Sequence, residues 1–290
     1  MSRSIAIIYP LFLLLALVSC RKTEEIVIRD NTAPPDYTVA DVTLESYINR
    51  SYISLLGRKP TDAEFATGLT QLRLNNVSQS NRETFLDGVF SNPYYPNRLF
   101  DVGRSLYLNG SDTTEFQEFI DIFEVLLQDT QYQAVWPEIR EEISKMQRVL
   151  DIPLDLGNGS IDIVEMHRRL CYNYVYDQIN MGTQNFVVSM FQNFFFRYPT
   201  VAELEAGETM VDGFNAIILL QTGQTKVDFI AIFLRSKDYA EGQVRDVFTR
   251  FLFREPMTEE MERLSIQFVN NWDYEALLKA VMTTNEYVGL

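Results

Sequence analysis

A short corner motif occurs in this chain in two close copies and one looser copy, and it constrains the fold more than any other feature. Each close copy has an arginine, a proline two residues later, a threonine directly after the proline, and a glutamate three residues beyond the threonine. The residues are Arg58, Pro60, Thr61 and Glu64 in the first copy and Arg197, Pro199, Thr200 and Glu203 in the second. Apolar runs with helical spacing flank each copy, which predicts the order helix, corner, helix.

The threonine and the glutamate of the motif have the spacing of a capping box. We expect the Thr61 hydroxyl to accept the backbone N–H of Glu64, and the Glu64 carboxylate to accept the N–H of Thr61. Pro60 disfavours helical backbone in the residue before it, so the preceding helix must stop there. Arg58 is expected in the last turn of that helix, where a cation stabilises free carbonyl groups. We interpret both close copies as structural corners and not as binding sites.

The third copy contains Arg254 and Pro256 but has Met257 in the place of the capping threonine. We therefore expect its helix to start one residue later, at Thr258. A Ser/Thr-x-x-Tyr pattern is interpreted as the end of each copy, 36, 42 and 33 residues after its arginine, at Tyr94, Tyr239 and Tyr287. The similar spacing between the corner and the Ser/Thr-x-x-Tyr pattern in all three copies indicates that the unit was duplicated. It predicts an all-α fold, with repeated helix-corner-helix units packed as one or two helical bundles.

The first copy resembles an uncharacterised helical domain of planctomycete surface proteins. The residues that carry this resemblance are Leu56, Gly57, Arg58, Pro60, Thr61, Glu64, Arg82, Asp87, Ser91, Tyr94 and Arg98. The later copies resemble short helical repeats of secreted bacterial proteins and the helices of phycobilisome linkers. Neither relative has a settled activity, so the resemblance implies a helical fold and an envelope setting but no chemistry.

The N-terminus has the pattern of a lipoprotein signal. Arg3 precedes an apolar run at residues 5–18, which is shorter than the roughly 20 residues that a membrane-spanning helix needs. The run ends in Leu17, Val18, Ser19 and Cys20, which resemble the lipobox of bacterial lipoproteins. This resemblance implies that residues 1–19 are a signal peptide and that Cys20 is acylated. An ordinary signal peptide with an incidental cysteine is the alternative.

Residues 20–43 are expected to form the lipid anchor and an extended tether, because they contain Pro34 and Pro35 and few apolar side chains. No aspartate follows Cys20 directly, so the inner-membrane retention signal of enterobacteria is absent. Lys22 followed by acidic residues resembles the surface-export signal of Bacteroidota lipoproteins. The sequence thus predicts a protein attached to the outer membrane through acylated Cys20, with an outward orientation favoured.

The chain is acidic, with 40 Asp and Glu against 25 Lys and Arg and a formal net charge of −15. This charge argues against nucleic acid as a partner and is compatible with a cationic partner or Ca²⁺. The single histidine, His167, excludes a His-rich metal site, and we expect no cofactor and no metal. His167 and Cys171 share a helix face, but the sequence offers no group to orient them for catalysis.

Residues 151–159 contain Pro153, Gly157 and Gly159 and are predicted to separate two halves. The N-terminal helical domain is placed at residues 44–150 and the C-terminal domain, with two further repeats, at residues 160–290. Residues 76–78 are expected to be a loop, and residues 214–223 to be helical or irregular.

The sequence has none of the common phosphate-binding, nucleophile-elbow or zinc-protease motifs, so we expect a non-enzymatic protein. The leading hypothesis is an accessory or scaffold subunit of an envelope transport or secretion assembly, with other outer-membrane or surface proteins as partners. The alternative is a surface lipoprotein that binds glycans or peptides through aromatic side chains. The residues considered for this are Trp136, Trp272, Tyr94 and Tyr95. A hydrolase that uses paired carboxylates is a third hypothesis.

Overall fold

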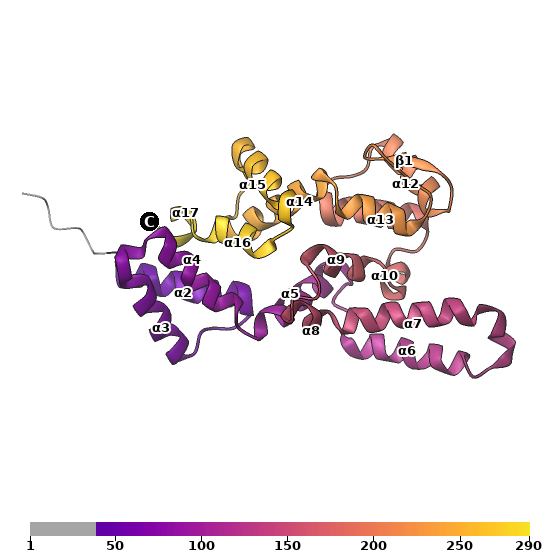
Figure 1. Cartoon of the computed structure of the whole chain (residues 1–290), viewed down its shortest axis with the longest axis horizontal. Helices are drawn as coiled ribbons and strands as arrows, with labels where there is room; N and C mark the ends of the chain where they lie inside the picture. The colour runs from indigo at the N-terminus through magenta and orange to yellow at the C-terminus, as the bar shows by residue number, and fades with distance from the viewer. Residues whose placement is uncertain (1–38) are drawn as a thin grey trace, which may run out of the picture. The chain divides into compact units, whose positions relative to one another are not determined.

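A computed structural model describes residues 39–290 of the chain. In this part the protein is all-α, with short connections between helices and a single two-stranded sheet (Figure 1). The predicted fold class is confirmed. The predicted signal peptide and Cys20 lie outside the described residues. The tether is predicted to reach residue 43, whereas helix α2 already begins at Asp41.

The first repeat consists of four helices, and the first corner joins the first two of them. They are α2 (Asp41–Leu56), α3 (Asp62–Arg73), α4 (Gln79–Phe90) and α5 (Tyr94–Tyr107). A 3₁₀ turn, η1 (Leu74–Val77), joins α3 to α4 in place of the predicted loop. Helix α2 contacts each of the other three, through a buried stripe that includes Leu44, Tyr47 and Ile48. This helical spacing of apolar residues is the pattern that predicted the helix.

The middle of the chain contains α6 (Thr113–Leu126), η2 (Thr130–Val135), α7 (Trp136–Leu150), α8 (Ile152–Gly157), α9 (Ile163–Cys171) and α10 (Tyr174–Ile179). Helices α6 and α7 lie side by side as a hairpin (Figure 1). The predicted boundary at residues 151–159 holds the short helix α8, which contacts α5 of the first repeat. The described residues belong to one compact unit. Between residues 39 and 290 no helix is both long and apolar enough to cross a membrane.

The second and third repeats overlap. The second contains α11 (Thr183–Met190) with its π-helical end η3 (Phe191–Phe195), then α12 (Val201–Val211), β1 (Ala216–Ile218), β2 (Gln221–Gly223), α13 (Lys226–Leu234) and α14 (Lys237–Leu252). The third begins with the same α14 and continues with α15 (Thr258–Asn271), α16 (Tyr274–Met282) and α17 (Asn285–Val288). Helix α14 contacts all three helices that follow it, as α2 does in the first repeat.

The segment at residues 214–223, predicted to be helical or irregular, forms an antiparallel hairpin instead. Ile217 pairs with Thr222 and Ile218 with Gln221, which leaves a two-residue turn of Leu219 and Leu220. Both turn residues have positive φ, 48° and 64°. Two-residue hairpin turns with this backbone usually contain Asn-Gly or Asp-Gly, so the sequence lacks the usual signal for a hairpin.

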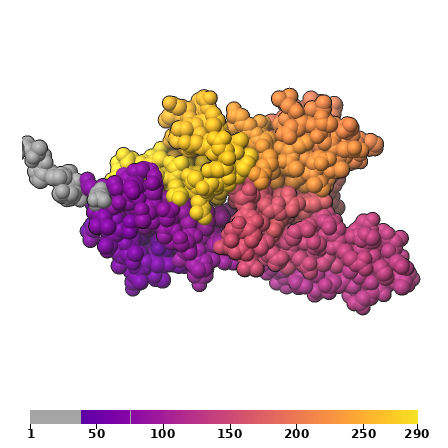
Figure 2. All heavy atoms as spheres, viewed as in Figure 1, coloured from indigo at the N-terminus to yellow at the C-terminus, as the bar shows by residue number. Residues whose placement is uncertain are grey.

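The first and third repeats pack against each other, although they are far apart in the sequence (Figure 2). Helix α17 contacts α2, and α16 contacts α4. The buried guanidinium of Arg82 in α4 donates to the carbonyl oxygens of Val77 and Thr283 at 2.8 and 2.7 Å and to Asn285 Oδ1 at 2.8 Å. Because an unpaired buried cation is costly, this network fixes the last repeat on the first.

Candidate functional site

The first corner has the predicted capping box and an ion pair that the sequence did not predict. Thr61 is the N-cap of α3, and its N–H donates to Glu64 Oε2 at 2.7 Å while the Glu64 N–H donates to the Thr61 hydroxyl. Arg58 lies two residues beyond the end of α2 and donates to both Glu64 oxygens at 2.8 and 2.7 Å. The prediction that Arg58 serves helix carbonyls in the last turn is wrong, because its guanidinium holds the capping carboxylate.

The second and third corners repeat this geometry. Arg197 donates to both oxygens of Glu203 at 2.8 and 2.6 Å, and Arg254 donates to both oxygens of Glu260 at 2.7 and 2.8 Å. The two later arginines also contact one further carboxylate each, Asp238 at 2.9 Å and Glu286 at 2.7 Å. Each corner is therefore fixed by a bidentate, charge-assisted pair.

The ion pairs shift the protonation of the corner glutamates. Hydrogen bonds from Arg58, opposed by burial, hold the pKa of Glu64 at about 2. The equivalent bonds from Arg197 do the same for the pKa of Glu203, also about 2. The pKa of Glu260 is lowered as well, chiefly by Arg254. Together with their spacing, these partners assign the corner residues to structure, in agreement with the interpretation from the sequence.

The third corner keeps the register of the other two. Helix α15 begins at Thr258, as expected, but Met257 is its N-cap, so this start is not shifted relative to the other two corners. Thr258 has the same place as Asp62 in α3 and Val201 in α12. The Met257 N–H donates to Glu260 at 2.7 Å, but methionine offers no oxygen to the Glu260 N–H. Half of the capping box is present.

The Ser/Thr-x-x-Tyr pattern begins a helix in the two later copies, whereas in the first copy Ser91 is the C-cap of α4 and ends that helix. The Ser236 hydroxyl accepts the N–H of Tyr239 at the start of α14, and Thr284 accepts that of Tyr287 at the start of α17. In the first repeat the buried tyrosine is Tyr95, one residue later than expected. These hydroxyls are N-caps, which also mark the end of the helix before them.

The connection between the second and third helices differs from one repeat to the next, unlike the corners. In the first repeat it contains Asn76 and Val77, both with positive φ, and Val77 is buried. In the second it is the hairpin with Leu219 and Leu220, and Leu220 is 98% exposed. In the third it contains Trp272, with φ 54°, whose ring lines a pocket. Positive φ is unfavourable for these bulky residues, so each connection holds its backbone at a cost.

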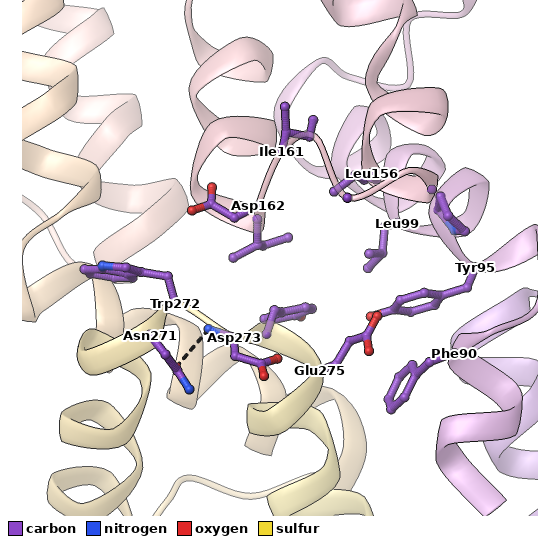
Figure 3. Close-up of a pocket in the computed structure, with 15 residues that line it drawn as sticks. Phe90, Tyr95, Leu99, Leu156, Ile161, Asp162, Asn271, Trp272, Asp273 and Glu275 are labelled. Atoms are coloured by element: carbon purple, nitrogen blue, oxygen red, sulfur yellow. Dashed lines mark hydrogen bonds between the residues drawn. The ribbon is translucent and has the colours of Figure 1, made fainter.

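The pocket at Trp272 has a volume of about 540 Å³. Its walls come from α4 and α5, from α8 and the start of α9, and from the turn between α15 and α16 (Figure 3). The polar and aromatic residues that line it are Phe90, Tyr95, Asp162, Asn271, Trp272, Asp273, Tyr274 and Glu275. The remaining lining residues are apolar or glycine. An apolar cavity with a few convergent polar groups is the usual form of a ligand site.

The structure brings two of the four predicted ligand aromatics together. Tyr95 and Trp272 both line the pocket. Tyr94 is exposed at the first corner, where the Arg58 guanidinium lies 5.1 Å from its ring centroid. Trp136 lies at the start of α7, and its indole N–H donates to the Leu126 carbonyl at 3.3 Å. The four rings therefore do not form a common platform.

Three carboxylates line the pocket, and two of them have structural roles. Asp162 accepts the N–H of Glu165 as the N-cap of α9 and lies 3.3 Å from Arg235. Asp273 accepts the N–H of Ala276 as the N-cap of α16. The pKa of Glu275 lies above its ordinary value, because the pocket walls partly desolvate its carboxylate and Asp273 is a like charge nearby. Capping of a helix therefore explains the presence of Asp162 and Asp273, and neither needs a role as an acid or a base.

His167 and Cys171, considered as a pair from the sequence, are both buried in α9 and do not bond to each other. His167 Nδ1 lies 2.8 Å from the Tyr239 hydroxyl, and the Cys171 thiol donates to the Arg168 carbonyl at 3.5 Å. Burial lowers the pKa of His167 to about 3 and raises that of Cys171 to about 12. A protonated thiol is a poor nucleophile, so these residues belong to the core.

Comparison with protein-family models, with curated proteins and with solved structures finds no match to this chain. The resemblance of the repeats to planctomycete surface proteins stays a prediction. The connections and the pocket are therefore the features of this chain that bear on its function.

The sequence reasoning missed the hairpin turn and the acidic part of the pocket. A signal for Asp162 and Asp273 was present, because each is an N-cap residue directly before an apolar helix. No local pattern places Glu275 beside Tyr95. Their proximity depends on the packing of the third repeat against the first, where α16 contacts α4 and α17 contacts α2.

Proposed function

We propose that this chain is a non-enzymatic lipoprotein of the outer membrane and an accessory or scaffold subunit of an envelope transport or secretion assembly. The observation that carries the proposal is the hairpin turn of Leu219 and Leu220. Both residues have positive φ, and Leu220 is almost fully exposed. Phe214 and Ile217 are exposed beside it in the sequence.

The hairpin turn adds little to the core, because Leu220 is exposed and only Leu219 is partly buried against the core. A backbone with positive φ costs a residue other than glycine roughly 1–2 kcal/mol. Exposed apolar groups on a rigid element are typical of surfaces that bind another protein. The net charge of −15 favours a partner with a basic rim around an apolar hollow.

The turn can be changed without harm to the fold, which makes the proposal testable. Replacing Leu219 and Leu220 by Asn and Gly supplies the residues that this turn prefers and removes both apolar side chains. We expect the tagged wild-type chain to retain a stoichiometric partner after extraction of native membranes in mild detergent, and the variant to lose it. Leu74→Asn, a change of an exposed leucine in the first connection, is the matched control. Equal retention by all three chains would contradict the proposal.

The lipid anchor has its own test. Cys20→Ser removes the thiol that the lipobox resemblance assigns to acylation, so we expect the protein to leave the membrane fraction and to lose incorporation of labelled palmitate. Cys171→Ser is the matched control. A membrane-bound, labelled Cys20→Ser variant would exclude the anchor.

A second candidate function, binding of a peptide or glycan at the cell surface, is favoured by the pocket of Tyr95 and Trp272. Its walls come from the first repeat, the middle segment and the third repeat. A ligand there would contact all three, so its binding would stabilise the chain against unfolding.

A further inference from the structure

All the charged residues that line the pocket are acidic. Asp162, Asp273 and Glu275 line it, and none of its lining residues is a lysine or an arginine. Asp162 has Arg235 as its ion-pair partner. Within residues 39–290, no cation lies at ion-pair distance from Asp273 or Glu275. The pocket therefore has a negative potential, which Arg235 at Asp162 and Lys279 near Glu275 compensate only in part.

One polar atom in the pocket wall also lacks a partner. The Tyr95 hydroxyl is buried and forms no hydrogen bond in the structure, and the residue is only 4% exposed. Figure 3 shows Tyr95 pointing into the pocket, toward the side chain of Glu275. Buried hydroxyl groups are nearly always hydrogen-bonded, so an unpaired one at a cavity wall indicates a missing partner.

The shape of the site favours an organic cation over a metal ion. Among residues 39–290, no three His, Cys, Asp or Glu side chains are arranged to hold a metal. The pocket is large, and the ring of Trp272 forms part of its wall. The Arg235 guanidinium lies 5.2 Å from the centroid of that ring, so a ligand cation would share the indole with Arg235. Indole faces bind alkylammonium and guanidinium groups well.

We propose that the pocket binds an organic cation, an alkylammonium or guanidinium group, held between the carboxylates of Glu275 and Asp273 and the Tyr95 hydroxyl, with Trp272 beside it. The proposal rests on the second candidate function and specifies its ligand class. The group can come from a lysine or arginine side chain of a peptide or from a free polyamine. The alkyl stem of either would lie against the apolar wall formed by Leu99, Leu156 and Ile161.

The protonation of Glu275 supports this ligand class. Desolvation and the like charges of Asp273 and Asp87 raise the pKa of Glu275, whereas Lys279 opposes them. The other titratable groups that line the pocket are Asp162, Tyr95 and Tyr274. A bound cation would lower the pKa of Glu275, so affinity must fall as the pH drops through that raised pKa. A neutral sugar would show no such dependence.

Titration of the full chain in detergent, followed by the fluorescence of Trp272, tests the proposal. Trp136→Phe leaves Trp272 as the only indole. The probes are acetyl-Gly-Lys-Gly-amide, spermidine and the neutral sugar cellotriose. We expect the lysine peptide or spermidine to bind, and Glu275→Gln to weaken that binding about tenfold, because a charge-assisted hydrogen bond is lost. Glu259→Gln, an equal change of charge on the exposed face of α15, should leave the affinity unchanged.

Asp273→Asn gives a second variant that keeps the N-cap of α16, because asparagine caps as well as aspartate. We expect it to weaken cation binding too, and a higher salt concentration to weaken it further. Binding by the peptide alone or by spermidine alone identifies the source of the cation. Binding of cellotriose without the cations, unchanged in Glu275→Gln, overturns the inference but keeps the second candidate function. Binding by none of the probes overturns both, and the scaffold proposal is tested separately.

Discussion

The corners have the same geometry in all three repeats, whereas the connections between the second and third helices differ from one repeat to the next. Every corner has an arginine that holds the capping glutamate through two hydrogen bonds, and an aromatic ring six residues before that arginine. The ring centroids of Tyr52, Phe191 and Phe248 lie 5.8, 5.0 and 5.0 Å from the guanidinium of their corner. The connections share only positive φ. Val77 is buried, Leu220 is exposed, and Trp272 lines the pocket.

The contrast indicates where function is located in a repeat protein of this kind. A geometry repeated three times with the same partners reports on folding. The connections keep an unfavourable positive φ in every repeat, but the side chain at that position and its surroundings change. Such a position indicates a function that is specific to one repeat. The corners should therefore respond to mutation through stability, and the second and third connections through binding.

Removal of a corner arginine should have the largest effect. We expect Arg254→Ala to lower the free energy of unfolding by about 2–3 kcal/mol, because it leaves Glu260 and Glu286 unpaired and facing each other. Arg58→Ala should cost less, since Arg58 pairs with one carboxylate, Glu64. Denaturant unfolding measures both.

The exposed Arg140 of α7, which belongs to no corner, provides the control for this prediction, because Arg140→Ala should change the stability by less than about 0.5 kcal/mol. In a double-mutant cycle, Arg58→Ala and Glu64→Ala should be non-additive, since the two side chains are in contact. Additive losses would mean that the ion pair does not stabilise the corner, and the comparison would lose its basis.

Acid should weaken the first two corners. The folded pKa of Glu64 and Glu203 is about 2, below the ordinary value of 4.5, so their contribution is complete above about pH 4.5. It is lost as the pH falls toward 2, by about 1–2 kcal/mol per corner after allowance for solvent screening. Glu64→Gln should flatten the dependence of stability on pH between 5 and 2, as measured by urea unfolding. Glu83→Gln, on the exposed face of α4, should not.

Loss of the capping hydroxyl separates the first corner from the third. Thr61→Ala should lower stability by about 0.5–2 kcal/mol, the usual cost of an N-cap. Met257→Ala should be close to neutral, because Met257 accepts no hydrogen bond through its side chain. Met257→Thr should restore the missing half of the box and raise the melting temperature. No loss of stability in Thr61→Ala would show that the Thr61 hydroxyl contributes nothing.

Substitution of the hairpin turn should change the stability least, although we expect it to change partner binding most. Leu219 and Leu220 replaced by Asn and Gly should leave stability unchanged or raise it by about 0.5–1 kcal/mol, since the strain of two positive φ angles is relieved. Thermal unfolding of the variant and the wild-type chain measures this. A clear loss of stability would place the hairpin turn with the corners, as a structural element.

The sequence predicted the all-α fold and the capping boxes because both are local. Hydrophobic spacing and the order Pro-Thr-x-x-Glu act within one or two helical turns. The role of Arg58 was misjudged for a related reason. The position of the arginine relative to the helix end depends on Gly57, whose φ of +70° ends α2 and turns the chain toward the next helix. Phe196 and Phe253 adopt the same backbone at φ 56°, and no sequence rule expects a phenylalanine there.

The pocket and the hairpin could not be predicted from local patterns. Tyr95 and Glu275 are brought into the same pocket only by the packing of the third repeat against the first. The hairpin uses two leucines where turns with this backbone prefer asparagine and glycine. Neither feature follows a local rule, so the sequence carries no warning of the pocket or of the hairpin, and at these two places we locate function.

Because Cys171 is buried, the rate of its modification by a thiol reagent measures how often this part of the protein opens. Its side chain is fully enclosed and its pKa is about 12, so the folded protein offers a thiol reagent almost no thiolate. Once Cys20 is acylated, as proposed, Cys171 is the only free thiol of the chain. The rate at which it reacts therefore counts the openings of α9 and its surroundings. Membrane-bound protein could be followed in this way in its native envelope, without any introduced label.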